Sequence, residues 1–534
     1  MHKNWVFLAI AFSLTKLLQT SKILSIVKGE SFAFSGNLQK EGEPMRSSGI
    51  LMHITSLPGP YGIGTLGKNA FAFVDFLHKA GQTCWQVLPM NPTGYGDSPY
   101  QSCSAFAGNH YLIDLERLVQ DGLLFPVELE NYQWGERKDR VDFGLQYQLR
   151  LELLRLAYRR FGNHKALDAF ALENSDWLPD FSLYMALKDR FDGKPWYCWE
   201  NPLKYREPDA VWKARQELSD QIRFYNFVQY LFYTQWGALH DYAAQRGIRI
   251  LGDVPIYVPL DSVEVWCSPE LFQLDKTLTP VAVAGCPPDG FTEDGQLWGN
   301  PLYRWDVMEK DNYRWWIRRL RAARRWYDMI RLDHFRGFEA YWSVPYGDLT
   351  ARNGKWVKGP GLGFLQVIQN ELPDLEMIAE DLGFLTPEVL AMRDDSGLPG
   401  MKVLQFAFDS REPSDYLPHT YIENTVCYTG THDNMTTRQW LETAEQDVRD
   451  YAADYMGLSR REGYVWGTIR TAMGSVSRLC VIPMQDYLEL DGQARMNFPG
   501  TMGNNWVWRA VEGSFGDPLA EKIYKMTTLY GRLP

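Results

Sequence analysis

The chain has 534 residues, 45% of them hydrophobic and 23% charged, which is an ordinary composition for a globular protein with a large core. Its formal net charge of −11 argues against nucleic acid as the main partner, because binding phosphate groups requires a basic surface. Seven scattered cysteines without a Cys-x-x-Cys spacing argue against a zinc site or a disulfide framework, and indicate reduced thiols.

Residues 1–44 differ from the rest of the chain. An apolar run at 5–14 is too short to span a bilayer and is typical of a signal peptide core, but no small-residue cleavage site follows it. A basic, amphipathic arm is a second interpretation, and a third is that Met45 is the true start. We favour the third, which predicts a cytoplasmic protein with no membrane partner. A genuine targeting segment would predict a plastid or exported protein instead.

Eight short apolar runs follow, and many of them end in polar or charged residues. They lie at 49–55, 83–89, 248–258, 328–334, 376–381, 402–408, 424–433 and 477–486. Nearly continuous apolar runs suit strands that are buried on both faces, as in a parallel sheet. Helical patterns separate several of the runs, for example at 69–80 and 313–327. The pattern therefore predicts an α/β fold, a (β/α)8 TIM barrel within residues 45–534.

Two connections are too long for ordinary barrel loops, and we predict that each is an inserted subdomain. The first, 90–247, follows the second strand and contains helical patterns near 143–161 and 220–245. The second, 259–327, follows the third strand and includes a stretch rich in Gly and Pro. Both leave the C-terminal end of a strand, which is the barrel face that carries active sites.

The fourth predicted strand ends in a charged cluster. Side chains alternate along a strand, so Arg331 and Asp333 share one of its faces. The neighbouring cation favours the ionised carboxylate that a nucleophile or a charge stabiliser requires, although a structural ion pair explains this pattern equally well. Carboxylates at the ends of other predicted strands are Asp253, Glu380, Asp381 and Asp433.

Several acidic strand ends that meet at one barrel mouth are electrostatically costly unless a metal, bound cations or chemistry requires them. Arg331, Arg336, His334 and His432 already supply positive charge and hydrogen-bond donors there. We therefore predict no metal site and no cofactor. Paired carboxylates among many aromatic side chains fit glycoside chemistry instead, because one ionised carboxylate attacks the anomeric carbon and a protonated one acts as the acid.

Asp333 is the better candidate for the ionised partner, because it lies beside Arg331. Glu380 follows the apolar residues 377–379, so it is the better candidate for a raised pKa. Periodicity alone leaves open whether Glu380 or Asp381 points into the site.

Six motifs carry a family resemblance. They are Ser-Leu-Pro-Gly-Pro-Tyr-Gly at 56–62, Gly-Tyr-Gly-Asp-Ser-Pro-Tyr-Gln-Ser at 94–102, Gly-Asp-Val-Pro-Ile at 252–256, Arg-Leu-Asp-His-Phe-Arg-Gly at 331–337, Ala-Glu-Asp-Leu-Gly at 379–383 and Thr-Gly-Thr-His-Asp-Asn at 429–434. From about 48 to 508 the chain resembles the amylomaltases, or 4-α-glucanotransferases, of the α-amylase superfamily. The resemblance implies that Asp333 is the nucleophile, that Glu380 rather than Asp381 is the general acid/base, and that Asp433 stabilises the transition state.

The same resemblance implies a set of substrate-binding residues and the absence of a C-terminal β-domain. The set is Tyr95, Ser98, Tyr100, Asp253, Asp289, Trp298, Arg331, His334, His432 and Asn497. Within it, Arg331 would orient the nucleophile and Tyr100 would stack on a sugar near the scissile bond. Tyr95 would belong to a second, remote glucan groove, and Asp289 and Trp298 to a long loop over the cleft.

The function implied by the resemblance is transfer of an α-1,4-glucan segment from a donor maltooligosaccharide, starch or glycogen chain to an acceptor sugar. The configuration would be retained through a covalent glucosyl-Asp intermediate. A retaining hydrolase on the same scaffold is the nearest alternative, since the two enzymes differ only in whether water or a sugar reacts with the covalent intermediate. A catalytically silent glucan-binding protein is another, but it would not need to bring Asp333, Glu380 and Asp433 together.

Overall fold

The structure, a computed structural model, describes residues 46–533 apart from 289–291, 384, 410 and 412–413. The predicted arm at 1–44 and the predicted loop residue Asp289 therefore lie outside the described residues. None of the described helices combines the length and the apolar character needed to cross a lipid bilayer.

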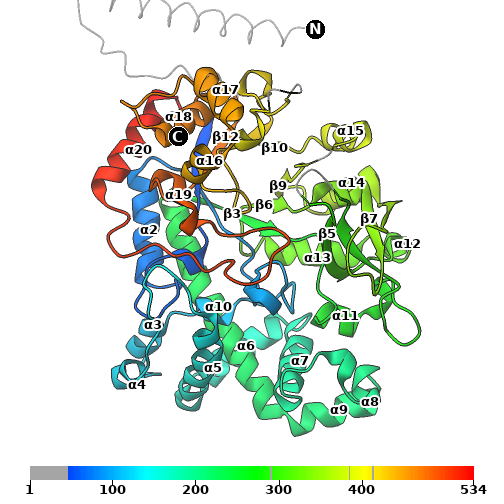
Figure 1. Cartoon of the computed structure of the whole chain (residues 1–534). Helices are drawn as coiled ribbons and strands as arrows, with labels where there is room; N and C mark the ends of the chain where they lie inside the picture. Colours follow the sequence, from blue (N-terminus) through cyan, green and yellow to red (C-terminus); the bar gives the residue numbers. More distant parts are fainter. Residues whose placement is uncertain (1–45, 289–291, 384, 410, 412–413, 534) are drawn as a thin grey trace, which may run out of the picture. The chain divides into compact units, whose positions relative to one another are not determined.

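Eight parallel strands close into a barrel in the order β1-β12-β11-β10-β9-β6-β3-β2 (Figure 1). They are β1 (Ser47–Leu51), β2 (Cys84–Gln86), β3 (Arg249–Val254), β6 (Met329–Leu332), β9 (Glu376–Ala379), β10 (Gly400–Val403), β11 (Thr425–Tyr428) and β12 (Leu479–Pro483). Each overlaps one of the eight predicted strands, so the predicted (β/α)8 barrel is confirmed. Every residue of β6, β11 and β12 is buried, because side chains fill the barrel on one face and helices cover the other.

Most helices outside the first long connection lie around the barrel or at its rim (Figure 1). The described helices outside this connection are α2 (Lys68–Lys79), α11 (Val263–Cys267), α12 (Trp305–Met308), α13 (Arg314–Ala323), α14 (Gly361–Glu371), α15 (Pro387–Ser396), α16 (Thr437–Thr443), α17 (Gln446–Met456), α18 (Tyr464–Gly474), α19 (Met484–Tyr487) and α20 (Asp517–Leu529). The helical patterns at 69–80 and 313–327 correspond to α2 and α13. Helix α15 has Pro387 in its first turn and ends at Gly397, whose φ of 70° is left-handed.

Strand β10 begins earlier than predicted and ends at Val403 instead of 408, where a short 3-10 turn, η8 (Leu404–Phe406), replaces it. The strand starts at Gly400, which pairs with Ala379 of β9. A Cβ atom at position 400 would lie 2.5 Å from Oδ2 of Asp381, so only glycine allows the strand to pass this carboxylate without a shift.

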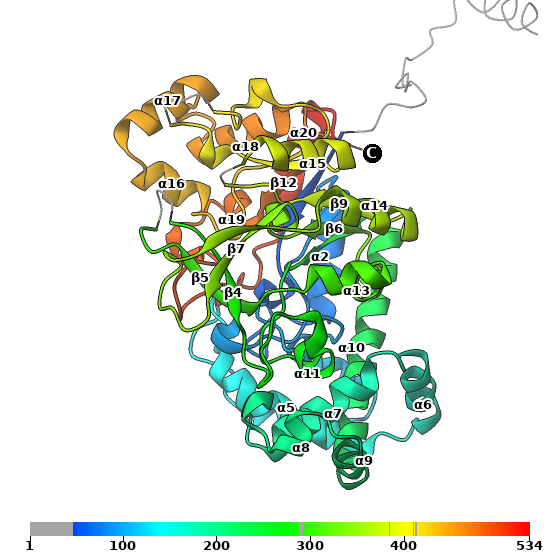
Figure 2. The same ribbon diagram turned by 90° about the vertical axis from the view of Figure 1, so that its right-hand side faces the viewer.

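The connection between β2 and β3 is helical. It contains α3 (Leu115–Gln120), α4 (Pro126–Glu130), α5 (Phe143–Arg160), α6 (His164–Glu173), α7 (Leu178–Arg190), α8 (Asn201–Lys204), α9 (Pro208–Glu217) and α10 (Ser219–Gln245). The helices predicted near 143–161 and 220–245 are α5 and α10. Figures 1 and 2 show α5, α7, α8 and α9 grouped together away from the barrel strands, and α10 runs from this group back to the barrel.

A four-stranded antiparallel sheet, which was not predicted, lies beside the barrel in the order β5-β4-β7-β8 (Figure 2). Its strands are β4 (Ala282–Cys286), β5 (Gln296–Pro301), β7 (Ala340–Pro345) and β8 (Lys355–Lys358). The pairs β4–β5 and β7–β8 each form within one segment, before and after β6, and the pairing of β4 with β7 joins them into one sheet. Trp342 and Trp356 face each other across β7 and β8, with ring centroids 5.1 Å apart.

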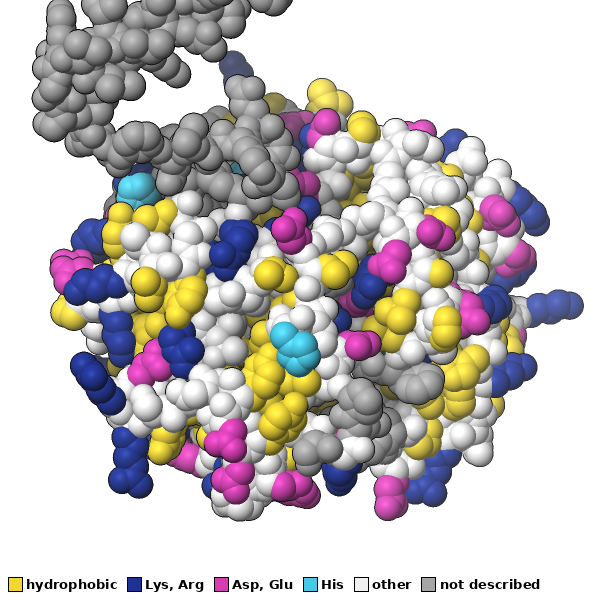
Figure 3. All heavy atoms as spheres, turned by 90° about the horizontal axis from the view of Figure 1, so that it is seen from above, with side chains coloured by type: hydrophobic (Ala, Val, Ile, Leu, Met, Phe, Trp, Pro, Cys, Tyr) yellow, Lys and Arg dark blue, Asp and Glu magenta, His cyan; other side chains and the backbone are white. Residues whose placement is uncertain are grey.

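On the face shown in Figure 3, Lys and Arg side chains are interspersed with Asp and Glu side chains. Such mixing is typical of an ordinary solvated surface.

Arg46, at the start of the described chain, is anchored by hydrogen bonds to three backbone carbonyls. Arg46 donates hydrogen bonds to the carbonyls of Tyr530 (3.0 Å), Met473 (3.0 Å) and Ser475 (2.6 Å). We expect a chain that starts at Met45 to keep the thermal midpoint of the full chain. A chain that starts at Ser47 loses these contacts and should unfold about 1–3 °C lower. Calorimetry on the three chains measures this, and a large loss for the Met45 start would contradict it.

Candidate active site

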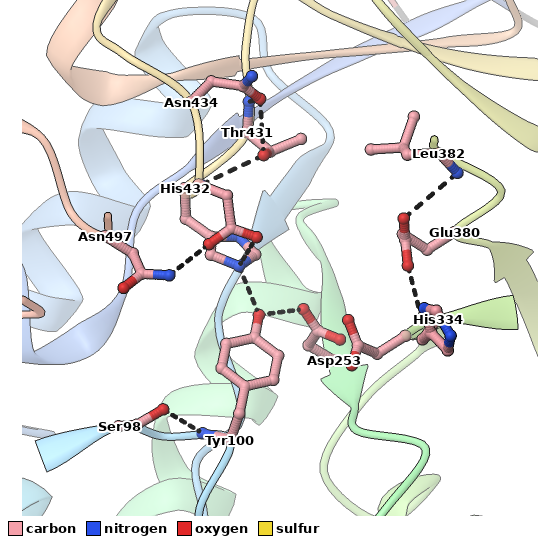
Figure 4. A network of polar contacts seen from close by, with 12 residues as sticks. Ser98, Tyr100, Asp253, His334, Glu380, Leu382, Thr431, His432, Asn434 and Asn497 are labelled. Atoms are coloured by element: carbon pink, nitrogen blue, oxygen red, sulfur yellow. Dashed lines mark hydrogen bonds and ion pairs between the residues drawn. The ribbon is translucent and has the colours of Figure 1, made fainter. Parts of the chain in front are cut away.

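Carboxylates gather where the barrel strands end, as predicted (Figure 4). Asp253 lies in β3, Asp333 directly follows β6, and Glu380 directly follows β9. Backbone hydrogen bonds continue past the strand ends and hold Asp333 and Glu380 in place. The Asp333 N–H donates to the Val254 carbonyl (3.1 Å), and the Glu380 N–H donates to the Leu332 carbonyl (3.0 Å). Their side chains are therefore presented from neighbouring, rigid strands.

Arg331 is the centre of the cluster. Its Nη1 lies 2.8 Å from both carboxylate oxygens of Asp253 and 3.0 Å from Oδ1 of Asp333, while its Nη2 lies 3.8 Å from Oε2 of Glu380. The Arg331 side chain is 4% exposed. Burial acts to lower the pKa of Arg331, but the carboxylates of Asp253 and Asp333 outweigh it and hold that pKa well above the ordinary value.

Burial raises the pKa of both the Asp333 and the Glu380 carboxyl, and Arg331 only partly offsets the rise. The sequence showed the cation beside Asp333, but the larger effect, burial, depends on the folded chain. Arg331 contacts Asp333 more closely than Glu380, so it stabilises the charge on Asp333 more strongly. When the pair carries one proton, that proton therefore belongs mainly to Glu380.

Glu380 and Asp381 point in opposite directions, which answers the question that periodicity left open. The Glu380 carboxylate accepts hydrogen bonds from the backbone N–H groups of His334 (2.6 Å) and Leu382 (3.3 Å), within the cluster. The Asp381 carboxylate instead binds Arg393 (2.7 Å) and the Met401 N–H (2.7 Å), so it anchors β10.

A hydrogen-bonded chain joins the barrel to the first long connection. The Tyr100 hydroxyl donates to Oδ2 of Asp253 (2.8 Å) and lies 2.9 Å from Nε2 of His432 (Figure 4). Burial lowers the pKa of His432, so its ring is neutral. Because the tyrosine proton goes to Asp253, Nε2 of His432 carries the proton of the second bond. Trp506, which sequence analysis missed, packs against both rings at centroid distances of 5.7 and 5.9 Å.

Asp433 is held from the C-terminal part of the chain. The Asn497 side chain donates to its Oδ1 (2.6 Å), and Arg495 donates both to the Asp433 carbonyl (2.7 Å) and to the Asn497 carbonyl (2.8 Å). Asn497 is one of the predicted binding residues, whereas Arg495 was not predicted. A lone arginine in a loop carries no sequence signal, and only its position in the fold reveals it.

The remaining predicted site residues differ in how they reach the cluster. The Trp298 ring, from β5, meets the His334 ring edge to face at 4.7 Å, and His334 has a left-handed φ of 49°. Ser98 acts on the local backbone, since its Oγ accepts the Tyr100 N–H (3.2 Å). Tyr95 begins a 3-10 turn, η2 (Tyr95–Asp97).

Within the described ranges, no group of three His, Cys, Asp or Glu side chains could hold a metal ion. The positive charge that faces the carboxylates comes from Arg331 instead.

A closed barrel of eight parallel strands, with buried carboxylates at the C-terminal strand ends, defines a (β/α)8-barrel enzyme. Residues 52–512 match the sequence profile of the 4-alpha-glucanotransferase family. A 4-alpha-glucanotransferase of Clostridium butyricum is 48% identical over 486 residues, which cover 90% of this chain and 100% of the relative. A chloroplastic/amyloplastic 4-alpha-glucanotransferase of Solanum tuberosum is 41% identical and covers 93% of this chain and 88% of the relative.

A solved structure is also similar. The amylomaltase of Streptococcus agalactiae in complex with acarbose superposes with a TM-score of 0.89 at 41% identity, covering 92% of this chain and 100% of that one. The chain therefore belongs to the 4-alpha-glucanotransferase family and is an enzyme that transfers glucan segments.

Proposed function

We propose that this enzyme transfers α-1,4-glucan segments by a retaining double displacement through a covalent glucosyl ester on Asp333. The observation that carries the proposal is the pair formed by Asp333 and Glu380, presented from neighbouring strands and linked by Arg331. A maltooligosaccharide, starch or glycogen chain would be the donor, and a second sugar the acceptor. The acarbose bound to the similar streptococcal amylomaltase supports a glucan substrate.

In the first step, the Asp333 carboxylate attacks the anomeric carbon of the donor while Glu380 gives its proton to the glycosidic oxygen. The C1–O bond breaks, and the part of the donor with the reducing end leaves. In the second step, an acceptor hydroxyl gives its proton to the Glu380 carboxylate while its oxygen attacks C1, and the ester bond to Asp333 breaks. Two inversions at C1 leave the configuration unchanged.

The other residues have supporting roles in this proposal. Asp433, oriented by Asn497, would stabilise the positive charge that develops on the sugar ring. Tyr100 and Trp298 would provide aromatic surfaces for sugar rings, and His432 would contact the sugar near Asp433. Arg331 would hold the nucleophile in place. Asp253, His334 and Ser98 would complete the binding set, and Asp289 and Tyr95 stay predictions outside the described contacts.

Transfer rather than hydrolysis is the central test. Water and an acceptor compete for the same ester, and water is far more concentrated, so transfer requires an acceptor held in an attack-ready position. Incubation with maltotriose should produce glucose and a ladder of longer maltooligosaccharides, with little gain in total reducing ends. Chromatography and a reducing-end assay measure both quantities. A steady rise in reducing ends without longer products would establish the hydrolase alternative.

The carboxyl pair also predicts the pH dependence. Activity requires ionised Asp333 and protonated Glu380, so kcat/KM should fall as the pH drops through the first pKa and fall again as it rises through the second. Because burial raises both pKa values, both limbs should lie at higher pH than those of solvent-exposed carboxyls. Glu380→Gln should remove the alkaline limb from the residual activity. Limbs at ordinary carboxyl pKa values would contradict this assignment.

The cellular location also stays a prediction: cytoplasmic, with a plastid or export as the alternative if residues 1–44 are a targeting segment. The name of the potato relative motivates the plastid alternative.

A further inference from the structure

The loop between β2 and α3 delivers Tyr100 to the site but has no strand pairing of its own. The backbone of 98–109 is irregular, so side chains from elsewhere must hold it. The Tyr100 hydroxyl nevertheless lies within hydrogen-bond distance of both Asp253 and His432. Such placement depends on whatever fixes the loop next to Tyr100.

Glu264 of α11 is the buried group that binds this part of the loop. It is 5% exposed, and its Oε1 accepts hydrogen bonds from the Ala105 N–H (2.8 Å) and the Ser104 hydroxyl (3.2 Å). The neighbouring Val263 N–H donates to the Cys103 carbonyl (2.9 Å). The start of α11 is therefore bonded to three successive residues of the loop, three to five positions after Tyr100.

The Ser104 hydroxyl also binds the next residues of the loop. While it donates to Glu264, its oxygen accepts from the N–H groups of Phe106 (3.2 Å) and Ala107 (3.3 Å). One carboxylate oxygen thereby orders a complete turn. Removing it would leave buried donors without an acceptor, which costs more than the loss of an exposed hydrogen bond.

Glu264 binds the loop through Oε1, which accepts both hydrogen bonds. Its Oε2 is buried and has no hydrogen-bond partner within the described residues. Burial raises the pKa of this carboxyl, which agrees with a group that acts through its acceptor oxygen. A glutamine keeps that acceptor and most of the shape, so it is the conservative replacement.

The far end of the loop is held independently. Gln229 of α10 accepts from the Gly108 N–H (2.7 Å) and donates to the Gly108 carbonyl (2.9 Å). Gln229 is buried as well, so it offers a matched comparison. It binds the loop at Gly108, eight residues after Tyr100, whereas Glu264 binds it four and five residues after Tyr100.

We propose that Glu264 is a positioning residue of this enzyme: its Oε1 fixes the turn at 103–105 and thereby sets the Tyr100 hydroxyl between Asp253 and His432. Glu264 touches none of the residues proposed to react. The inference rests on the part that the proposed function gives to Tyr100, and it adds a buried residue outside the binding set.

Maltotriose disproportionation by full-length variants tests the proposal, with the thermal midpoint recorded for each. Tyr100→Phe removes the hydroxyl that bridges two polar groups and should lower kcat/KM by roughly tenfold to hundredfold. Glu264→Ala should lower it by about tenfold or more, whereas Glu264→Gln should stay within about threefold of the parent. Glu270→Ala, at an exposed position near α11, should change nothing.

The decisive measurement combines the substitutions. In the Tyr100→Phe background, Glu264→Ala should cost clearly less than in the parent enzyme, because the hydroxyl that it positions is already absent and only the aromatic ring remains to be held. Gln229→Ala should cost the same factor in both backgrounds. If Glu264→Ala does not fold, Ser104→Ala replaces it. This variant removes the Ser104 bond to Glu264, together with the bonds that the hydroxyl accepts from Phe106 and Ala107, and leaves the Ala105 bond intact.

Two results would overturn the proposal. An equal cost of Glu264→Ala in both backgrounds would show that Glu264 does not act through the Tyr100 hydroxyl. A Glu264→Gln variant as impaired as Glu264→Ala would show that charge, not the acceptor oxygen, matters. Both differ from failure of the proposed function, in which the parent enzyme itself would produce no ladder from maltotriose.

Discussion

Replacing Asp333 by Asn should reduce turnover of maltotriose by four or more orders of magnitude, the largest loss that we expect from a single substitution. An amide has no ionised oxygen to attack the anomeric carbon, so the covalent step disappears while shape and most hydrogen bonds remain. The loss should be the same with maltotriosyl fluoride, an activated donor, because a better leaving group does not replace a nucleophile. Initial rates with both donors measure this.

A matched control flanks the same strand at its other end. Asp328 lies just before β6, at the opposite end of the barrel, where its carboxylate accepts the Ile250 N–H (2.7 Å). Asp328→Asn should retain turnover within a small factor, although it lowers stability. If Asp333→Asn were active with the fluoride, the covalent ester would have to form on another residue.

Replacing Glu380 by Gln should reduce turnover of maltotriose by about 10²–10⁴-fold while leaving glucan binding nearly unchanged. The two carboxylate oxygens of Glu380 accept from the His334 and Leu382 N–H groups, and an amide has a single oxygen, so it keeps at most one of these contacts. It has no acidic proton to give to the leaving oxygen. Binding by calorimetry and rates with maltotriose separate the two effects.

The activated donor gives the sharper result for this variant. Fluoride leaves without a proton, so Glu380→Gln should still form the ester on Asp333 with maltotriosyl fluoride and then release it slowly, for lack of a base. Mass spectrometry should find one maltotriosyl unit on the peptide that contains Asp333. Glu376→Gln, at the exposed start of the same strand, is the control and should behave like the parent enzyme. An unmodified Asp333 peptide in active Glu380→Gln would refute the covalent mechanism.

The barrel could be predicted from local pattern because its strands are buried on both faces. Burial of this kind makes each strand a short, nearly continuous apolar run, and the run ends where polar groups meet the barrel mouth. Asp333 and Glu380 were found for the same reason, since each directly follows such a run. The boundaries were less certain: β10 starts at Gly400, where the Asp381 carboxylate leaves no room for a Cβ atom, and no local pattern reports this contact.

Other features depend on residues that are distant in the sequence. Tyr100 is 153 positions from Asp253 and 332 positions from His432, so their hydrogen bonds exist only in the folded chain. The motifs suggested that Tyr100 matters, but not that it joins these two groups. The sheet of β4, β5, β7 and β8 becomes one sheet only through the pairing of β4 with β7, which lie in segments on either side of β6.

By itself, the sequence determined the barrel, the position of its acidic mouth and, through family motifs, the residues expected to react. Only the tertiary structure decided how those residues are held. It turned Asp381 away from the mouth, placed Arg331 against three carboxylates, and brought Arg495 and Trp506 to the site. It also showed that burial outweighs the neighbouring cation in raising the pKa of Asp333. The physical reason is that desolvation and long-range hydrogen bonds depend on what surrounds a residue in space, whereas a sequence pattern reports only its neighbours along the chain.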